Sequence, residues 1–228
     1  MPASNPSALP AEARMLVTRV LACSAEVAEQ VLRRGRLRRF PNRATILRQG
    51  DWLSLAFLLV LGRAHALLYS ADGQVILLHE YRAGDLFGAL GELEPVRQEC
   101  DVLAVEEARA LVLEAAELAL LAQQHSCIGL ALSRMLIRRL RQTTERMYER
   151  AALSAVGRVH AELLRQAREA ADLTIRPAPI LSELALRVAT TRETASRAVN
   201  ALERRGIIRR DADALIVVAP RRLEEMVF

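Results

Sequence analysis

The sequence predicts an α+β protein in which an antiparallel β-sheet domain, a long central helix and a winged helix-turn-helix follow one another along the chain. Three observations predict this order. Between Leu37 and Leu113, short apolar stretches alternate with turn residues at intervals of roughly ten residues, which is typical of an antiparallel sandwich or barrel. An unbroken helical pattern then runs from Ser126 to Ala152. Two closely spaced helices and a pair of short apolar stretches end the chain.

The composition is that of a folded protein without a membrane span or a disulfide framework. The chain has 228 residues, and 52% of them are hydrophobic, which provides enough material for a core. Its longest apolar run, Leu55–Leu61, has the length of a strand, whereas a membrane span needs roughly 20 residues. Residues 1–10 lack the pattern of a signal peptide, and the three cysteines lack the spacing of a structural zinc site. We therefore expect a soluble cytoplasmic protein.

The basic residues are all arginine, and their excess lies in the second half of the chain. The net charge is +5, and the part of the chain before residue 127 contributes none of this excess. A polyanionic partner is therefore expected to meet the C-terminal part.

Two short helices are predicted behind a loose, proline- and serine-rich arm at residues 1–10. The apolar spacing places them at Ala11–Ala22 and Ser24–Gly35. Ser24 is suited to cap the start of the second helix, and Gly35 is suited to end it.

The β-rich part contains strand patterns separated by turns that carry glycine or aspartate. Asp72-Gly73, between two apolar runs, is a hairpin signal. The predicted strands are Thr45–Leu47, Leu55–Val60, Ala64–Tyr69, Val75–Tyr81, Asp101–Val105 and Ala108–Leu113.

Helices return with Ala115–Gln124 and the long segment Ser126–Ala152. The long segment carries a seam with alternating steps of four and three, which is the repeat of a coiled coil. The seam consists of Leu136, Leu140, Thr143 and Met147. Apolar residues on the opposite face predict that the first half is buried on two sides. The pattern favours self-dimerisation, and a core helix without a partner chain is the alternative.

The C-terminal part has the pattern of a winged helix-turn-helix. A helix at Ser154–Ala171 and a proline-broken crossing precede it. The unit itself comprises a helix at Leu181–Val188, a turn at Ala189-Thr190-Thr191, a second helix at Arg192–Arg205, and a wing made of Gly206–Arg209 and Leu215–Val218.

The second helix of this unit combines an apolar face with a polar face near its N-terminus. Arg192, Glu193, Ser196 and Arg197 point out together, while every third or fourth residue between Ala195 and Leu202 is apolar. Arginine can donate two hydrogen bonds to guanine, and glutamate can accept one from cytosine, so this face suits a DNA major groove. Exposed ion pairs on an ordinary helix are the alternative interpretation.

Two segments resemble the CRP/FNR family of bacterial transcription factors, named after the cyclic-AMP receptor protein and the fumarate-nitrate regulator. The first is Ile46-Leu47-Arg48-Gln49-Gly50-Asp51, followed at the family's intervals by Gly62-Arg63, Asp72-Gly73 and Gly84-Asp85-Leu86-Phe87-Gly88. The second, from Thr191 to Arg197, resembles the family's recognition helix. The resemblance runs from about residue 12 to the C-terminus.

This resemblance implies a cyclic-nucleotide-binding-like β-roll with N-terminal helices in residues 1–125, a dimerisation helix in 126–152 and a winged helix-turn-helix in 153–228. It also implies a homodimeric regulator that is not an enzyme and that binds double-stranded DNA at an inverted repeat. RNA polymerase is a further partner that the resemblance implies.

By the same resemblance, Arg192 and Arg197 contact guanines, and Glu193 accepts from a cytosine. Members that read TGTGA half-sites usually have Gly in place of Ser196, whereas members that read TTGAT-type half-sites have Glu, Ser and Arg at these positions. The sequence has features of both sets, so the half-site stays open. The family often has Gly where Ala189 stands and a Thr cap near Ile180, so we expect a left-handed alanine and a missing or shifted cap.

The candidate effector pocket departs from that of cyclic-AMP-responsive relatives. In these, a Glu shortly after the Gly-Asp-x-x-Gly motif binds ribose, and an Arg-Ser pair binds the phosphate. The matching positions here are Ala89, directly after Gly88, and Gln98-Glu99, or Arg97-Gln98 if the loop is offset by one residue. Ala89 and Gln98-Glu99 offer no guanidinium to an anion. Thr143 and Thr144 match a Thr-Ser pair that contacts adenine. An effector other than cyclic AMP, or none, is therefore expected, and a cyclic-nucleotide-responsive regulator is the alternative.

No cofactor or metal is expected. An iron–sulfur cluster needs four cysteines, and the chain has three. Haem is an alternative, since candidate axial ligands are present: His65, His79, His125, His160, Cys100 and Cys127. Cys23, Cys100 and Cys127 are also candidate thiol sensors. A metal-dependent cupin-like enzyme and a small-molecule-binding subunit of another protein are the remaining hypotheses, and neither explains the recognition helix.

Overall fold

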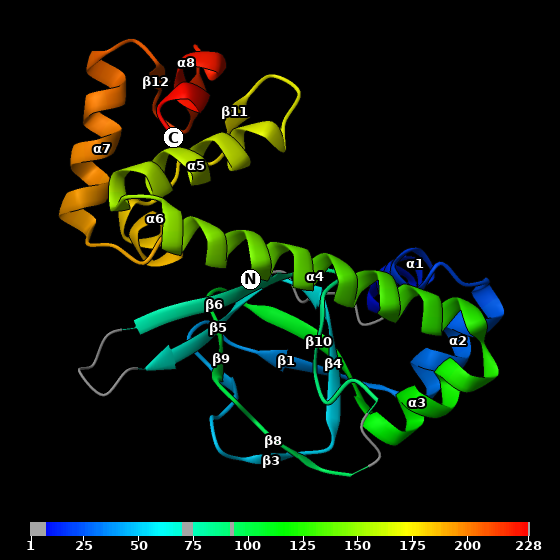
Figure 1. Ribbon diagram of the computed structural model, residues 1–228. Helices are drawn as coiled ribbons and strands as arrows, with labels where there is room; N and C mark the ends of the chain where they lie inside the picture. The colour runs from blue at the N-terminus through cyan, green and yellow to red at the C-terminus, as the bar shows by residue number, and fades with distance from the viewer. Residues whose placement is uncertain (1–7, 70–74, 92–93, 228) are drawn as a thin grey trace. The chain divides into compact units, whose positions relative to one another are not determined.

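The computed structural model describes residues 8–69, 75–91 and 94–227, and the chain divides into two compact units. The first unit ends at Arg139 and the second begins at Leu140. The boundary therefore falls inside the long helix α4 (Ser126–Ala152), whereas the sequence places boundaries at either end of that helix (Figure 1). The expected Asp72-Gly73 turn and most of the expected N-terminal arm lie outside the described residues.

The two N-terminal helices are confirmed. Helix α1 (Ala8–Leu21) begins within the stretch expected to be a loose arm, and α2 spans Ala25–Arg34. Ser24 caps α2 as predicted, because its hydroxyl accepts a hydrogen bond from the Val27 amide at 3.4 Å. The Gly35 amide donates to the Val31 carbonyl at 3.1 Å and ends the helix.

Antiparallel strands form two four-stranded sheets and a two-stranded ribbon in the first unit. The strand orders are β1-β10-β4-β7, β2-β9-β5-β6 and β3-β8. The bounds are β1 (Arg36–Phe40), β2 (Thr45–Leu47), β3 (Trp52–Leu53), β4 (Leu55–Leu61), β5 (Arg63–Tyr69), β6 (Val75–Arg82), β7 (Leu86–Gly88), β8 (Val96–Arg97), β9 (Asp101–Ala104) and β10 (Ala108–Glu114).

All six predicted strands are present, and four further strands escaped prediction. Three of the latter, β3, β7 and β8, have only two or three residues, too few for a periodic pattern. The fourth, β1, has four exposed residues out of five and therefore no alternation of apolar and polar side chains.

Successive residues of the central strands supply two different cores. Phe57 and Leu59 of β4 face a cluster between the two sheets, whereas Ala56 and Leu58 face a cluster formed with the helices α1, α2, α3 (Ala115–Gln124) and α4. Burial on both faces explains the uninterrupted apolar run of this strand. The strand ends at Gly62, where φ is +84° and a Cβ atom would lie 2.3 Å from the Glu107 carbonyl oxygen.

Helix α4 is buried only in part. Ile128 and Met135 are buried against the first unit, and Ile137 is 50% exposed in the single chain. Burial of the first half on two sides stays a prediction. Among the described residues, no helix combines the length and the apolar character that a membrane span requires.

The second unit is a winged helix-turn-helix, as predicted. Its elements are α5 (Ala155–Arg168), β11 (Thr174–Ile175), α6 (Leu181–Arg187), α7 (Arg192–Arg204), β12 (Ile208–Arg210), β13 (Leu215–Val217) and α8 (Pro220–Glu225). The wing is a three-stranded sheet of order β11-β13-β12, so β11 and α8 are additions to the predicted elements. One cluster of buried apolar residues from α5, α6, α7, the wing and α8 forms the core.

Candidate nucleic-acid interface

Helix α7 is held by its apolar face. Ala195, Ala198, Val199 and Leu202 are each at most 3% exposed and belong to the core of the second unit. On the other side, Arg192, Glu193 and Arg197 are exposed, and Ser196 is half-buried. The structure thus brings the predicted DNA-contacting side chains together near the N-terminus of one helix.

The start of α7 is fixed by Thr191, which is its N-cap. The Thr191 hydroxyl accepts a hydrogen bond from the Thr194 amide at 3.2 Å. Hydrogen bonds to the backbone amide of Glu193 and to the Thr191 side chain lower the pKa of Glu193 below its usual value. Glu193 is therefore an ionised carboxylate near neutral pH, which accepts hydrogen bonds and donates none.

The exposed charged side chains near the start of α7 do not form ion pairs with one another. Within the described residues, no ion pair joins Glu193 to Arg192 or Arg197, and Arg197 makes a long contact of 3.5 Å from Nη2 to the Thr194 hydroxyl. The alternative of an ordinary helix covered with ion pairs therefore does not describe this face. The two guanidinium groups are available to acceptors from outside the chain.

Arg158 of α5 fixes the turn between α6 and α7. Its Nε atom donates to the Val188 carbonyl at 2.8 Å, and its Nη2 atom donates to the Ala189 carbonyl at 3.1 Å. Its Nη1 atom donates to the Leu153 carbonyl at 3.1 Å, so one side chain connects this turn to the segment that follows α4. Sequence reasoning missed this residue, because no local pattern marks a contact about thirty positions away.

Both expected departures at the helix-turn-helix are confirmed. Ala189 has a φ of +50°, which is the left-handed region. Helix α6 begins after Ile180, which is 60% exposed and supplies no side-chain cap.

Arg210 of β12 connects the wing to α7. Its Nη2 atom donates to the Asn200 Oδ1 atom at 2.9 Å, and its Nε atom donates to Glu203 at 3.0 Å. The same contact lowers the pKa of Glu203 and raises that of Arg210. Other arginines of this unit remain exposed and give its surface a basic character; they include Arg204, Arg205, Arg209, Arg221 and Arg222.

Two candidate effector residues of the first unit, Ala89 and Gln98, form hydrogen bonds with backbone carbonyls of other residues. Ala89 is fully buried, and its amide donates to the Leu55 carbonyl at 2.9 Å. Gln98 donates through Nε2 to the Cys100 carbonyl at 2.8 Å, while Glu99 is exposed. Gly88, with φ at +88°, could not carry a side chain, because a Cβ atom would lie 2.4 Å from the Leu55 carbonyl oxygen.

Aromatic side chains fill the space between the two sheets. Tyr81 stacks on Phe87 with 4.5 Å between the ring centroids, and Phe87 stacks on Phe57 at 5.3 Å. The Arg139 guanidinium lies 5.3 Å from the centre of the Tyr81 ring and donates to the Leu86 carbonyl at 2.7 Å. Burial raises the pKa of Tyr81 to about 12, so its hydroxyl keeps its proton at neutral pH.

Thr143 and Thr144 belong to the second unit, unlike the other candidate effector residues. Both are exposed on α4, and the Thr144 hydroxyl donates to the Leu140 carbonyl at 3.0 Å. Their participation in a pocket with Ala89 and Gln98 stays a prediction.

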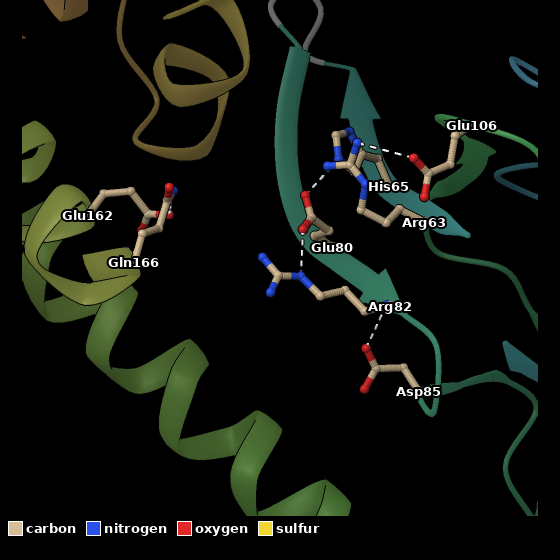
Figure 2. Close-up of polar contacts among 8 residues, drawn as sticks. All are labelled: Arg63, His65, Glu80, Arg82, Asp85, Glu106, Glu162 and Gln166. Atoms are coloured by element: carbon tan, nitrogen blue, oxygen red, sulfur yellow. Dashed lines mark hydrogen bonds and ion pairs between the residues drawn. The ribbon is translucent and has the colours of Figure 1, made fainter. Parts of the chain in front are cut away.

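A buried polar network that the sequence did not reveal lies in the β5–β6 hairpin (Figure 2). The His65 Nε2 atom is 3.0 Å from a Glu80 carboxylate oxygen, and these residues are 5% and 8% exposed. Arg82 donates through Nε to the other oxygen of Glu80 at 2.9 Å. One nitrogen of the candidate haem ligand His65 is thus already engaged.

His160 and the cysteines, which are also candidate cofactor ligands or thiol sensors, lie in surroundings that disfavour these roles. His160 lies with Nδ1 3.2 Å from the Met226 carbonyl, and its pKa is lowered mainly by burial. All three cysteines are free, and burial raises the pKa of Cys23 and Cys100, which disfavours the reactive thiolate. Within the described part of the chain, no three His, Cys, Asp or Glu side chains form a group that could hold a metal ion.

Comparison with protein families gives two matches, in the order that the structure shows. Residues 37–125 match the cyclic nucleotide-binding domain, and residues 157–226 match the Crp-like helix-turn-helix domain.

The chain belongs to the CRP/FNR family.

Relatives of known function are members of this family too. The cAMP-activated global transcriptional regulator Vfr of Pseudomonas aeruginosa is 27% identical over 192 residues, which cover 81% of this chain and 90% of that protein. The cAMP-activated global transcriptional regulator CRP of Salmonella typhimurium is 25% identical over 194 residues, with coverage of 81% and 90%. This CRP/FNR protein is accordingly a DNA-binding transcription regulator, and the relatives it matches are regulators rather than enzymes.

Solved structures confirm the fold. A CooA mutant from Carboxydothermus hydrogenoformans aligns with a TM-score of 0.80 at 20% identity, covering 93% of this chain and 95% of that one. FixK2 from Bradyrhizobium japonicum aligns with a TM-score of 0.72 at 19% identity, covering 84% and 96%.

Replacing Ala189 by Gly is expected to stabilise this CRP/FNR protein. A left-handed alanine costs roughly 1–2 kcal/mol, and glycine loses roughly 0.5–1 kcal/mol more backbone entropy on folding. We therefore expect Ala189→Gly to raise the free energy of unfolding by about 0.5–1 kcal/mol, measured by urea denaturation. Ala201→Gly, inside α7, is the control and should lower it by about the same amount. A destabilised Ala189→Gly protein would show that the turn is not left-handed in solution.

Proposed function

We propose that this regulator binds an inverted-repeat operator as a homodimer, that α7 reads the bases of each half-site, and that its effector is not cyclic AMP. One observation above all supports base reading by α7. The apolar face of α7 is buried, and the Arg192, Glu193 and Arg197 side chains are exposed together on the opposite face. A helix held in this way can present these groups to a major groove without losing its place in the core.

The exposed groups have the chemistry that base edges require. Arg192 and Arg197 can each donate two hydrogen bonds to the O6 and N7 atoms of a guanine, and the ionised Glu193 can accept from the N4 amino group of a cytosine. Thr191 and Ser196 flank this set and can contact phosphates or bases. The half-site is of the TGTGA or the TTGAT type.

Arg197→Ala is expected to remove most of the discrimination between the operator and a scrambled duplex. Loss of one bidentate base contact corresponds to roughly 1–3 kcal/mol, or about a ten- to hundredfold loss of discrimination. The operator is first located by genome-wide footprinting, and affinities for both duplexes are then measured by fluorescence anisotropy. Arg204→Ala, at the far end of the same helix, should weaken binding to both duplexes alike. Unchanged discrimination in Arg197→Ala would exclude Arg197 from base reading.

The exposed seam of α4 supports the dimer. Leu136, Leu140 and Met147 are 48%, 67% and 67% exposed, and Thr143 is exposed between them. Apolar side chains at this spacing gain from burial against the same seam of a second copy. A twofold dimer places two recognition helices about 34–36 Å apart, one turn of DNA, which is why we propose an inverted repeat.

Leu140→Glu is expected to shift the protein to monomers, because two carboxylates would meet at the centre of the seam. Multi-angle light scattering at micromolar concentration measures the mass. Gln142→Glu adds the same charge to an exposed position two residues further along the helix and should leave the dimer intact. A Leu140→Glu protein that remains dimeric would mean that a different surface forms the dimer.

The effector proposal rests on what surrounds the candidate pocket residues. The relatives Vfr and CRP are described as cAMP-activated. In this chain Ala89 is buried, Gln98 binds the Cys100 carbonyl, and Glu99 adds a negative charge. These three positions offer no cation to a cyclic phosphate. The β-roll and α4 would still form the element whose two states an effector biases.

Cyclic AMP is expected to leave the melting temperature unchanged. A ligand present at a hundred times its dissociation constant stabilises the folded state by about 2.7 kcal/mol, which a thermal melt resolves easily. The melt is followed by circular dichroism with cyclic AMP up to millimolar concentration, and 5′-AMP is the control for nonspecific effects. A dose-dependent rise with cyclic AMP alone would overturn this assignment.

The same proposal places the regulator in the cytoplasm, with RNA polymerase as the further partner of the DNA-bound dimer. It includes no haem, and two of the six candidate axial ligands are already engaged: His65 is paired with Glu80, and His160 is buried against the Met226 carbonyl. The absorption spectrum of the purified protein tests this part directly.

A further inference from the structure

The end of α4, from Leu140 to Ala152, belongs to the second unit but not to its apolar core. Within the described residues, the core cluster of this unit contains no residue of α4. Most side chains of this stretch are exposed. Packing in the apolar core therefore does not fix the angle between α4 and α5.

Charged side chains join the two helices instead. The Arg165 guanidinium of α5 donates through Nη2 to Glu149 of α4 and through Nη1 to Glu162 of α5. Glu162 also accepts a hydrogen bond from Gln166 at 2.8 Å, and both of these side chains project from α5 (Figure 2). A planar guanidinium can hold two carboxylates at once, whereas the ammonium group of lysine is a compact point charge.

This bridge is largely withdrawn from water. The side chains of Glu149 and Glu162 are 14% and 6% exposed, and that of Arg165 is 31% exposed. Burial raises the pKa of Glu149, and the neighbouring Arg165 opposes this rise. Ion pairs in such surroundings are screened by salt much less than pairs on the surface.

Arg146 completes the charge balance three residues before Glu149 on α4. It is half-buried, and its Nη1 atom has no hydrogen-bond partner among the described residues. Burial lowers the pKa of Arg146, and attraction to Glu162 and Glu149 opposes this. Two arginines thus face two carboxylates, while Glu145 and Arg187 add one charge of each sign nearby.

The bridge closes a triangle at the joint between the helices. Helix α4 ends at Ala152 and α5 begins at Ala155, so the chain connects them at one corner. Arg165 lies ten residues into α5, roughly 15 Å from its start at about 1.5 Å per residue. Its contact with Glu149 supplies the third side and so restricts the angle between the helices.

The angle matters because α4 and α5 hold the two surfaces that operator binding would use. Thr143 and Met147 of the exposed seam lie on the part of α4 that belongs to the second unit. Val159 and Leu163 of α5 share a core with α7. In a twofold dimer joined at the seam, the angle between α4 and α5 sets the distance between the two recognition helices.

We propose that Arg165 is a positioning residue that sets the separation of the two recognition helices through its bridge from α5 to Glu149 of α4. Without this guanidinium, Glu149 and Glu162 would repel each other and the joint would open. The proposal rests on the homodimer and the inverted repeat proposed above. Arg165 makes no contact with DNA in this role, and it determines which spacing between half-sites fits best.

The test uses the full-length protein, the footprinted operator and two operators whose spacer is one base pair longer or shorter. One base pair moves a half-site by about 3.4 Å and turns it by roughly 35°. By fluorescence anisotropy, the native protein should prefer the natural spacing by at least about tenfold. Arg165→Gln should reduce this preference to less than about threefold, because helices released from the bridge adapt to several spacings.

Arg168→Gln is the matched control. Arg168 also lies on α5, but it is paired with Glu224 of α8 at 3.0 Å, so its loss leaves the joint with α4 unchanged. Both partners of this pair are about half exposed, and such pairs contribute little. The spacing preference of this variant should therefore stay within about twofold of the native value.

Two further measurements distinguish positioning from a general loss of structure. A duplex with a single half-site should bind Arg165→Gln within about twofold of the native affinity, because α7 keeps its place in the core. Glu149→Gln should reduce the spacing preference as Arg165→Gln does. The double variant should add nothing further, since both single changes break the same contact.

The positioning role is overturned, with the inverted-repeat dimer intact, if Arg165→Gln keeps the native preference or if Arg168→Gln loses it equally. It is also overturned if Arg165→Gln loses half-site binding, since Arg165 would then stabilise the unit rather than direct it, or if the effects of the Glu149 and Arg165 variants add. A native protein that binds the operator without preferring any spacing would refute the inverted-repeat dimer, and this role with it.

Discussion

The burial of one face of α7 is the constraint on which DNA recognition by this regulator depends. Small residues, Ala195 and Ala198, let the helix lie close to its neighbours, and Val199 and Leu202 fill the core around it. With that face fixed, the helix cannot rotate about its axis, so its exposed arginines stay on the outward side. Arg158 adds a second restraint, because it binds two carbonyls of the turn that leads into the helix.

The first unit is stabilised by two layers of buried side chains. One lies between its two four-stranded sheets, and the other lies between one of these sheets and the helices. Phe57, Tyr81 and Phe87 stack between the sheets, and the outer face of β4 and β10 is covered by helices. Arg139 connects α4 to this interior through the Tyr81 ring and the Leu86 carbonyl. A change in the roll that moves the Tyr81 ring or the Leu86 carbonyl would therefore reach α4 directly.

Edges and buried charges are where sequence reasoning and structure differ most. Strand β1 carries arginines on both faces, because an exposed edge has no core to impose alternation and charges protect it from uncontrolled pairing. His65 and Glu80 stand in strands that read as ordinary apolar runs, and only the pairing of β5 with β6 places them face to face. Arg158 binds carbonyls about thirty residues away, which no window of the sequence contains.

The sequence by itself determined the elements whose signals are local. Capping by Ser24, the period of α7 and the seam of α4 all act between residues less than one or two turns apart, so a short window of the sequence reveals them. The resemblance to the family then predicted the order of the domains and the residues that we propose to read DNA. Only the tertiary structure decided the contacts that depend on chain segments meeting in space: the free edge of β1, the third strand of the wing, and the arginine that fixes the turn. Such contacts arise from packing and register, and these are properties of the whole fold rather than of any segment.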